Sequence, residues 1–420
     1  MKTINSNEKN KIINFLEFLF SFFTIICSNS VYFSGKTKII WLFLGFILVV
    51  IYFNINNYFN INNYHNIKMI FISAFFYLIY VFIFILGSLS ISSLNVPMII
   101  SSFLTPLLLF IIIYCSYYNN SSNIILYIKN IILFLALFSL AFWLMEQIGI
   151  PTNMSKLIYW GGPHYIPGYW GIQYVAQGEN LFLGLDLFRN TGIFVEAPMY
   201  SFVLCVGLLL NVFIFGKKLI SISTILLILT IFTTTSTTGL LFILATIVIY
   251  FYINNKKASK YLKLISLPFI LYISYRLAEI IFSDKQSGSG MGSISLRSDD
   301  FNAGNLAWHQ HLLFGNGIGN MDSIIMYMDP HRIFTDQTGF SNGIMVVLAF
   351  GGIYLLIMYI IPILFSMFCG KKIFLSSLLL FMLFIFTIVN DSPLFYTIDV
   401  YFIVIYLKNK NNKDSAYVLN

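Results

Sequence analysis

The chain has 420 residues, of which 58% are hydrophobic, 18% are aromatic and only 10% are charged. Soluble domains carry about 25% charged residues, so this composition excludes a chain of two or three soluble domains. It predicts a single integral membrane domain over residues 1–420, built from helices. The net charge of +8 becomes informative only when the charges are placed along the chain.

Apolar stretches of about 20 residues, the length that a helix needs to cross the hydrocarbon core, recur along the chain. We expect about twelve membrane-spanning helices, of which the seventh, eighth and twelfth are short. The polar run 233–238 is either a tight external turn or part of a hairpin inside the membrane. The predicted spans are 12–30, 39–57, 68–90, 97–116, 124–147, 193–215, 219–234, 237–253, 262–281, 343–368, 373–390 and 394–407.

An even number of spans places both termini on one side of the membrane. Most lysines, including Lys9, Lys129, Lys217 and Lys408, fall on that side. The positive-inside rule identifies it as cytoplasmic. The first apolar stretch lacks a small-residue cleavage site, so we interpret it as a retained span and not as a signal peptide.

Two predicted external loops, at about 148–192 and 282–342, are longer than the other connections. Long loops are usually functional, and we expect short interfacial helices in both. All four arginines lie outside the membrane or near the outer end of a span, and most acidic residues lie on that side too. A transporter more often carries its ionisable residues at mid-membrane.

The cysteines form no CxxC pair and no cluster with histidine, which argues against a disulfide framework or a zinc site. We expect them to be buried small hydrophobic side chains, and we assign no metal and no cofactor. The four are Cys27, Cys115, Cys205 and Cys369.

The first external loop ends with an arginine and a carboxylate, Arg189 and Glu196, close to the sixth span. Pro198 suits the first turn of the helix that follows. Arginine can hold a phosphate with two hydrogen bonds, but an Arg189–Glu196 ion pair that anchors the loop explains the pattern equally well. Tyr169 and Trp170 could stack on sugars or belong to an interfacial aromatic belt.

The second external loop carries Arg297, a pair of histidines at 309 and 311, and the glycine-rich run 315–320. His309 and His311 would not share a helix face, and adjacent Asp299 and Asp300 are poorly spaced for chelation, so neither pair predicts a metal. The glycine run is either a backbone nest for an anion or a flexible turn. Asn342 precedes the tenth span, where Gly351 and Gly352 permit close helix packing. In the ninth span, Arg276 and Glu279 share a helix face.

Taken together, these segments resemble the family of bacterial O-antigen and capsule repeat-unit polymerases and O-antigen ligases. The resemblance rests on Arg189–Pro198, on the polar turn Thr233–Leu240, on Arg297–Asn320 and on Asn342–Ile353, and it covers roughly 185–355. In the polar turn, Thr237 replaces an arginine that is often found there. Ser341 replaces the histidine of the ligases, which favours the polymerase branch.

The resemblance implies a GT-C-like architecture in the bacterial inner (plasma) membrane with the active site outside the cytoplasm. It implies an inverting, metal-independent glycosyltransferase whose donor is a glycan linked to undecaprenyl pyrophosphate. Candidate partners besides the lipid bilayer are a flippase and a chain-length regulator; no nucleic acid is expected. The implied catalytic residues are Arg189, Arg297, Glu196, His309 and Asp336, and the substrate-binding residues are Arg276, Arg332, His311, Asn342, Trp170 and Tyr169.

Two alternatives stay open at the level of the sequence. A flippase or other transporter predicts a cationic cavity inside the membrane, whereas only Arg276 is expected there. A ligase shares the chemistry but uses another acceptor. For the polymerase itself, the base that receives the acceptor proton could be Glu196, Asp336 or one of His309, His311 and His331, and no motif identifies the sugars.

Overall fold

The fold is known from a computed structural model of the chain. The structure describes residues 6–55, 64–89, 91, 95–118, 123–159, 163–182, 185–254, 291–335 and 338–418. Its long helices are α1 (Ser6–Ile26), α2 (Gly35–Ile55), α3 (Tyr64–Leu89), α4 (Val96–Tyr118), α5 (Ile124–Gln147), α6 (Ala197–Leu209), α7 (Ile222–Thr233), α8 (Thr237–Asn254), α10 (Met291–Gln310), α13 (Gly343–Ser366), α14 (Lys371–Phe386) and α15 (Pro393–Val418).

Every predicted span except 262–281 coincides with one of these helices, and 262–281 lies outside the described residues. Among the described residues, seven helices are long and apolar enough to cross a membrane. They are α2, α3, α4, α5, α6 with its π-helical extension at Leu210–Ile214, α8 and α13 with its 3₁₀ extension to Cys369. This architecture is that of a polytopic membrane protein, as the composition predicts. The number of twelve crossings stays a prediction.

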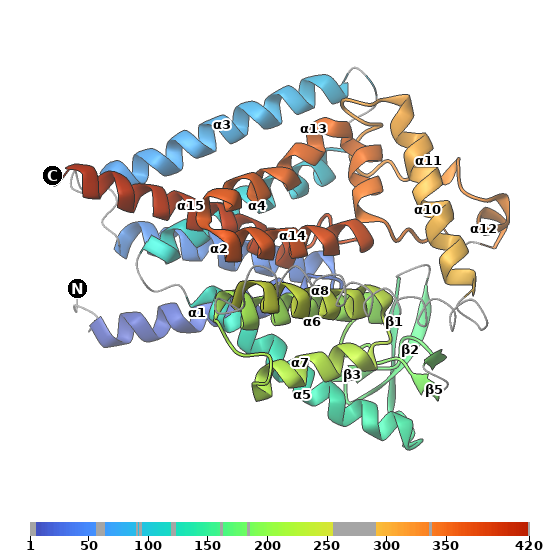
Figure 1. The fold of residues 1–420 in the computed structure, drawn as a ribbon. Coiled ribbons are helices and arrows are strands. Elements are labelled where there is room, and N and C mark those ends of the chain that lie inside the picture. Colours follow the sequence, from blue (N-terminus) through green and yellow to red (C-terminus); the bar gives the residue numbers. More distant parts are fainter. Residues whose placement is uncertain are drawn as a thin grey trace, which may run out of the picture.

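The helices form an elongated bundle whose two ends differ in character (Figure 1). The start of α1 and the end of α15 lie together at one end. The opposite end carries the β-strands and the helices α10, α11 (Asp322–Ile325) and α12 (Pro330–Phe334). Helix α10 lies across this end of the bundle. The two long loops of the sequence are therefore gathered at a single end, opposite both chain termini.

Helix α6 lies in the interior of the bundle, whereas α3 lies at its edge. The residues of α6 are buried almost without exception, whereas α3 exposes Phe71, Phe75 and Phe82 along its length. A helix that is apolar all round must be surrounded by protein or by lipid, so α6 suits the interior and α3 suits a lipid-facing edge.

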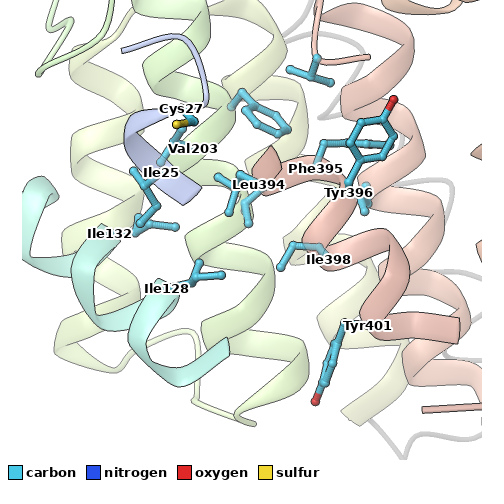
Figure 2. Close-up of a cluster of buried hydrophobic side chains, with 14 of the residues drawn as sticks. Ile25, Cys27, Ile128, Ile132, Val203, Leu394, Phe395, Tyr396, Ile398 and Tyr401 are labelled. Atoms are coloured by element: carbon cyan, nitrogen blue, oxygen red, sulfur yellow. The ribbon is translucent and has the colours of Figure 1, made fainter. Parts of the chain in front are cut away.

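Side chains are closely packed in the core where α1, α5, α6 and α15 meet. Figure 2 shows Ile25 of α1 and Cys27, which directly follows α1, together with Ile132 of α5, Val203 of α6 and Leu394 of α15. These side chains converge, and each of them is buried. Inside a membrane such packing, and not exclusion from water, holds helices together. Cys115 and Cys205 are buried as well, which confirms that these cysteines act as small core residues, while Cys369 is partly exposed.

The first long loop does not form the short helices expected of it; it forms two small antiparallel sheets. Strands β1 (Met154–Ile158), β2 (His164–Tyr169) and β3 (Gln173–Tyr174) make one sheet, with Lys156 opposite Ile166. Strands β4 (Glu179–Phe182) and β5 (Leu185–Phe188) make a hairpin. The all-helical prediction is wrong here, whereas the second loop contains the expected helices α10, α11 and α12.

Helix α13 is broken at Gly352, whose φ of 60° lies in the left-handed region. The segment 312–317 pairs with the break: Asn316 N–H donates to Ala349 O at 2.7 Å, and Ile353 N–H donates to Leu312 O at 3.0 Å. Non-helical backbone at such a place is tolerated because the protein supplies its hydrogen bonds. Gly317 N–H is likewise bound to Phe350 O, so the glycine-rich run packs against a helix, and the N–H groups of Asn316 and Gly317 are occupied by its carbonyl oxygens.

Buried carboxylates occur within the predicted spans. Glu17 of α1 is fully buried and accepts hydrogen bonds from Tyr52 of α2 and Ser116 of α4. Asp399 of α15 is also buried. These groups are acidic, so they do not form the cationic cavity that the flippase alternative predicts. Arg276, the cationic residue expected inside the membrane, lies outside the described residues, and that expectation stays a prediction.

Candidate functional site

A cavity of about 610 Å³ opens where the ends of several helices meet the second long loop. It is walled by the starts of α6 and α8, one face of α10, the end of α14 and the segment 338–341. Its polar and charged lining consists of Gln177, Arg189, Glu196, Ser236, Thr237, Arg297, Asp300, Arg332, Thr338, Ser341 and Thr387. Residues from both long loops and from the polar turn thus share one hollow.

Arg189 is held at the cavity by the polar turn between α7 and α8. Its Nε donates to Thr235 Oγ1 at 3.0 Å and to Thr234 O at 3.3 Å. The next residue, Asn190, is fully buried, and its amide nitrogen binds Thr233 Oγ1 at 3.0 Å. Thr235 has a φ of 49°, a strained conformation for a β-branched residue. The polar run 233–238 is therefore a turn buried inside the protein. Its threonines hold Arg189 and Asn190, which directly follow β5.

Arg297 reaches the same turn from α10. Its Nη1 donates to Thr237 Oγ1 at 3.3 Å. Burial lowers the pKa of Arg189 to about 10; the charge of Glu196 opposes this shift, and that of Arg297 adds to it. Burial also lowers the pKa of Arg297, against the opposing effect of the charges of Glu196 and Asp300. Both groups remain charged at neutral pH. Within the described part of the chain, neither guanidinium lies within 4.0 Å of a carboxylate, so no Arg189–Glu196 ion pair anchors the loop.

Arg332, by contrast, is neutralised. Its Nη1 lies 2.6 Å from Asp299 Oδ2 and 2.9 Å from Asp300 Oδ1, and its Nη2 donates to Gly339 O at 2.7 Å. Asp300 also accepts from the Ser341 hydroxyl at 2.6 Å and the Ser341 N–H at 2.8 Å. Burial raises the pKa of Asp300 in spite of these partners. Arg332 therefore links α12 and the segment 338–341 to α10.

Glu196 stands at the start of α6 but does not cap it. Its backbone is extended, and its side chain makes no capping hydrogen bond. The amide oxygen of Gln177 instead accepts from Ala197 N–H at 3.1 Å. Gln177 comes from the loop after β3, and both Gln177 and Glu196 line the cavity.

Ser236 supplies a further polar group. It is 1% exposed, lines the cavity and has a hydroxyl with no hydrogen-bond partner among the described residues. It directly precedes α8, and the start of a helix carries partial positive charge. Neither Ser236 nor Gln177 is identified as a site residue by the sequence; the polar run 233–238 signals a turn but assigns it no role, and nothing marks Gln177.

Several residues implied by the resemblance lie away from the cavity. His309 and His311 are exposed and do not line it. Tyr169 is buried, with its hydroxyl bound to Ile150 O, whereas Trp170 is 62% exposed. Asn342 caps α13 by accepting from Met345 N–H at 3.2 Å. The remaining two, Arg276 and Asp336, lie outside the described residues.

The cavity can therefore bind an anion. Among the described residues, it presents two arginines with no carboxylate oxygen within 4.0 Å, a buried hydroxyl, and the positive ends of α6 and α8. Among the described residues no group of three or more histidine, cysteine, aspartate or glutamate side chains could hold a metal ion. Comparison of the chain with protein-family models, curated proteins and solved structures finds no match.

Proposed function

We propose that this protein polymerises oligosaccharide repeat units linked to undecaprenyl pyrophosphate into a surface polysaccharide, an O-antigen or a capsule. The observation that supports this most is the pair Arg189 and Arg297, which line one cavity and are held by hydroxyls and a carbonyl oxygen, not by carboxylates. A site built in this way has positive charge available for a ligand that brings its own negative charge.

The proposed reaction is a single displacement at the anomeric carbon of the donor glycan. A hydroxyl of a second lipid-linked repeat unit attacks this carbon, and the bond to the pyrophosphate oxygen breaks with inversion. The leaving diphosphate is already a stable anion, so the main requirement is charge stabilisation in a partly dehydrated site. One preorganised donor of this kind contributes about 3 kcal/mol, and Arg189 and Arg297 would supply such donors without a metal or a cofactor.

The membrane topology that belongs to this proposal has twelve spans and a GT-C-like architecture. Both termini lie in the cytoplasm of a bacterium, and the cavity opens outside the plasma membrane. The lysine distribution supports the orientation, and the gathering of both long loops opposite the termini agrees with it (Figure 1). A lipid-linked donor can reach such a cavity from the outer leaflet, and a flippase would deliver it.

Deletion of the gene in its native host tests the proposal against both alternatives. Loss of a polymerase leaves single repeat units at the cell surface, loss of a flippase retains repeat units inside, and loss of a ligase leaves finished polymer on the carrier lipid. Purified protein in vesicles with a lipid-pyrophosphate repeat unit should also produce a ladder of longer glycans. Either of the other two phenotypes, or no ladder, would overturn the proposal.

A further inference from the structure

The proposed reaction needs a group that receives the proton of the attacking hydroxyl, and the cavity narrows the choice. Among the described residues, two carboxylates line it, Glu196 and Asp300, while Asp336 lies outside these residues. Both oxygens of Asp300 are engaged, one by Arg332 and the other by Ser341. The three exposed histidines of the second loop do not line the cavity.

Glu196 occupies the N-cap position of α6, but its side chain does not cap this helix. An acidic residue at this position usually accepts a hydrogen bond from the first turn of its own helix. Here the amide oxygen of Gln177 binds the first N–H of the helix, that of Ala197, at 3.1 Å. The carboxylate of Glu196 makes no capping bond and faces the hollow that also holds Arg189 and Arg297.

We propose that Glu196 is the catalytic base and that Gln177 is the positioning residue that keeps its carboxylate at the reacting hydroxyl. The inference rests on the proposed function. As the oxygen of the acceptor hydroxyl bonds to the anomeric carbon, its proton passes to the Glu196 carboxylate. The electron pair of the breaking bond leaves with the diphosphate, whose charge Arg189 and Arg297 balance. The diphosphate departs as an anion, so the step needs no general acid.

The first test compares Glu196→Gln and Glu196→Asp with the wild type in the vesicle assay. General-base catalysis contributes about 10²–10⁴-fold, so E196Q should lose at least 100-fold in kcat while its KM for the lipid-pyrophosphate donor changes little. E196D should recover part of the rate, and the fall of the wild-type rate at acidic pH should be absent in the residual activity of E196Q. A residual rate above one tenth of wild type in E196Q would overturn the assignment.

The second test separates positioning from folding by a matched pair at residue 177. Gln177→Met keeps the shape of the side chain but removes the acceptor of the Ala197 N–H, whereas Gln177→Asn retains a neutral amide acceptor. Q177M should lower kcat about tenfold with little change in donor KM, and Q177N should recover part of the loss. Equal rates for the pair, whether both normal or both reduced, would refute the positioning role.

The control variant Asp186→Asn removes an exposed carboxylate of β5 that does not line the cavity, and it should retain wild-type kcat. If D186N loses activity as strongly as E196Q, the loss is not specific to Glu196 and the assignment of the base fails. Failure of this inference and failure of the proposed function give different results: an active E196Q with a normal glycan ladder contradicts only the base, whereas a wild-type protein that makes no ladder contradicts the function itself.

Discussion

The two walls of the cavity use arginine in opposite ways. On the wall formed by α12 and the segment 338–341, Arg332 is bound by Asp299 and Asp300 and ties two pieces of backbone together. On the wall formed by the polar turn, Arg189 and Arg297 are bound by threonine side chains and a carbonyl oxygen. Neutral partners fix the direction of a guanidinium without cancelling its charge, so geometry separates a structural arginine from two that can act on a ligand.

The largest effect should follow from replacing the arginines of the polar-turn wall. Arg189→Ala and Arg297→Ala each remove a charge aimed at the ligand, and each should reduce the polymerisation rate about 10²–10³-fold. Arg189→Lys should recover little, because lysine lacks the planar pair of donors. The rate is measured from ladder formation by purified protein in vesicles.

Lys36→Ala is the matched control for these variants, because it removes an exposed positive charge from the first turn of α2, away from the cavity lining. Its rate should equal that of the wild type. If a protein that lacks both Arg189 and Arg297 still made normal polymer, these arginines would not act on the ligand, and the proposed difference between the two walls would be wrong.

A smaller effect on activity but a large one on stability is expected for Arg332→Met. Asp300, whose side chain is 2% exposed, would lose its buried partner, and breaking such a pair costs about 3–5 kcal/mol. Thermal unfolding of the purified protein should therefore occur at a lower temperature. The double variant R332M/D300N should recover part of the loss, and a double variant no more stable than R332M would contradict the pairing.

The threonine that holds Arg297 should matter less. Thr237→Val removes the hydroxyl that accepts from Arg297 Nη1, and the loss of one such hydrogen bond, about 0.5–1.5 kcal/mol, should lower the polymerisation rate up to about tenfold. Thr237→Ser should restore it. Thr246→Val, on the same helix, removes a buried hydroxyl without a hydrogen-bond partner in the described structure and should leave the rate unchanged.

The smallest effect concerns pH. Burial raises the pKa of Asp300 above its ordinary value of 3.8. The folded state therefore holds this proton more tightly than the unfolded state, and the stability it contributes is lost as the pH rises from about 4 through the folded pKa. Each unit of the pKa difference corresponds to about 1.4 kcal/mol. Unfolding temperatures measured across this range should show the decline in the wild type and lack it in D300N.

The bundle could be predicted from the sequence because apolar runs of membrane length leave few structural choices. The β-strands of the first long loop could not. Strands β1 and β2 are five and six residues long, and β2 contains Pro167. In so short a segment the alternation of exposed and buried residues is faint, and the aromatic residues around it are equally typical of a membrane interface.

The residues of the candidate site also fall into those that could be identified from the sequence and those that could not. Arg189, Glu196, Arg297 and Arg332 could be identified because charge is rare in this chain, and the cavity contains all four. Gln177 and Ser236 could not, since an amide or a hydroxyl acquires its role only from the backbone it meets. His309 was a candidate on residue type alone, and α10 turns it to the exterior.

The break in α13 has a consequence for how the molecule is assembled. Beyond Gly352 the helix cannot satisfy its own backbone, because Ile353 and Tyr354 donate to Leu312 and Leu313. An added Cβ at Gly352 would lie 2.4 Å from the carbonyl oxygen of Leu313. The bundle and the segment that follows α10 must therefore mature as one unit, because α13 reaches its final shape only when that segment is in place.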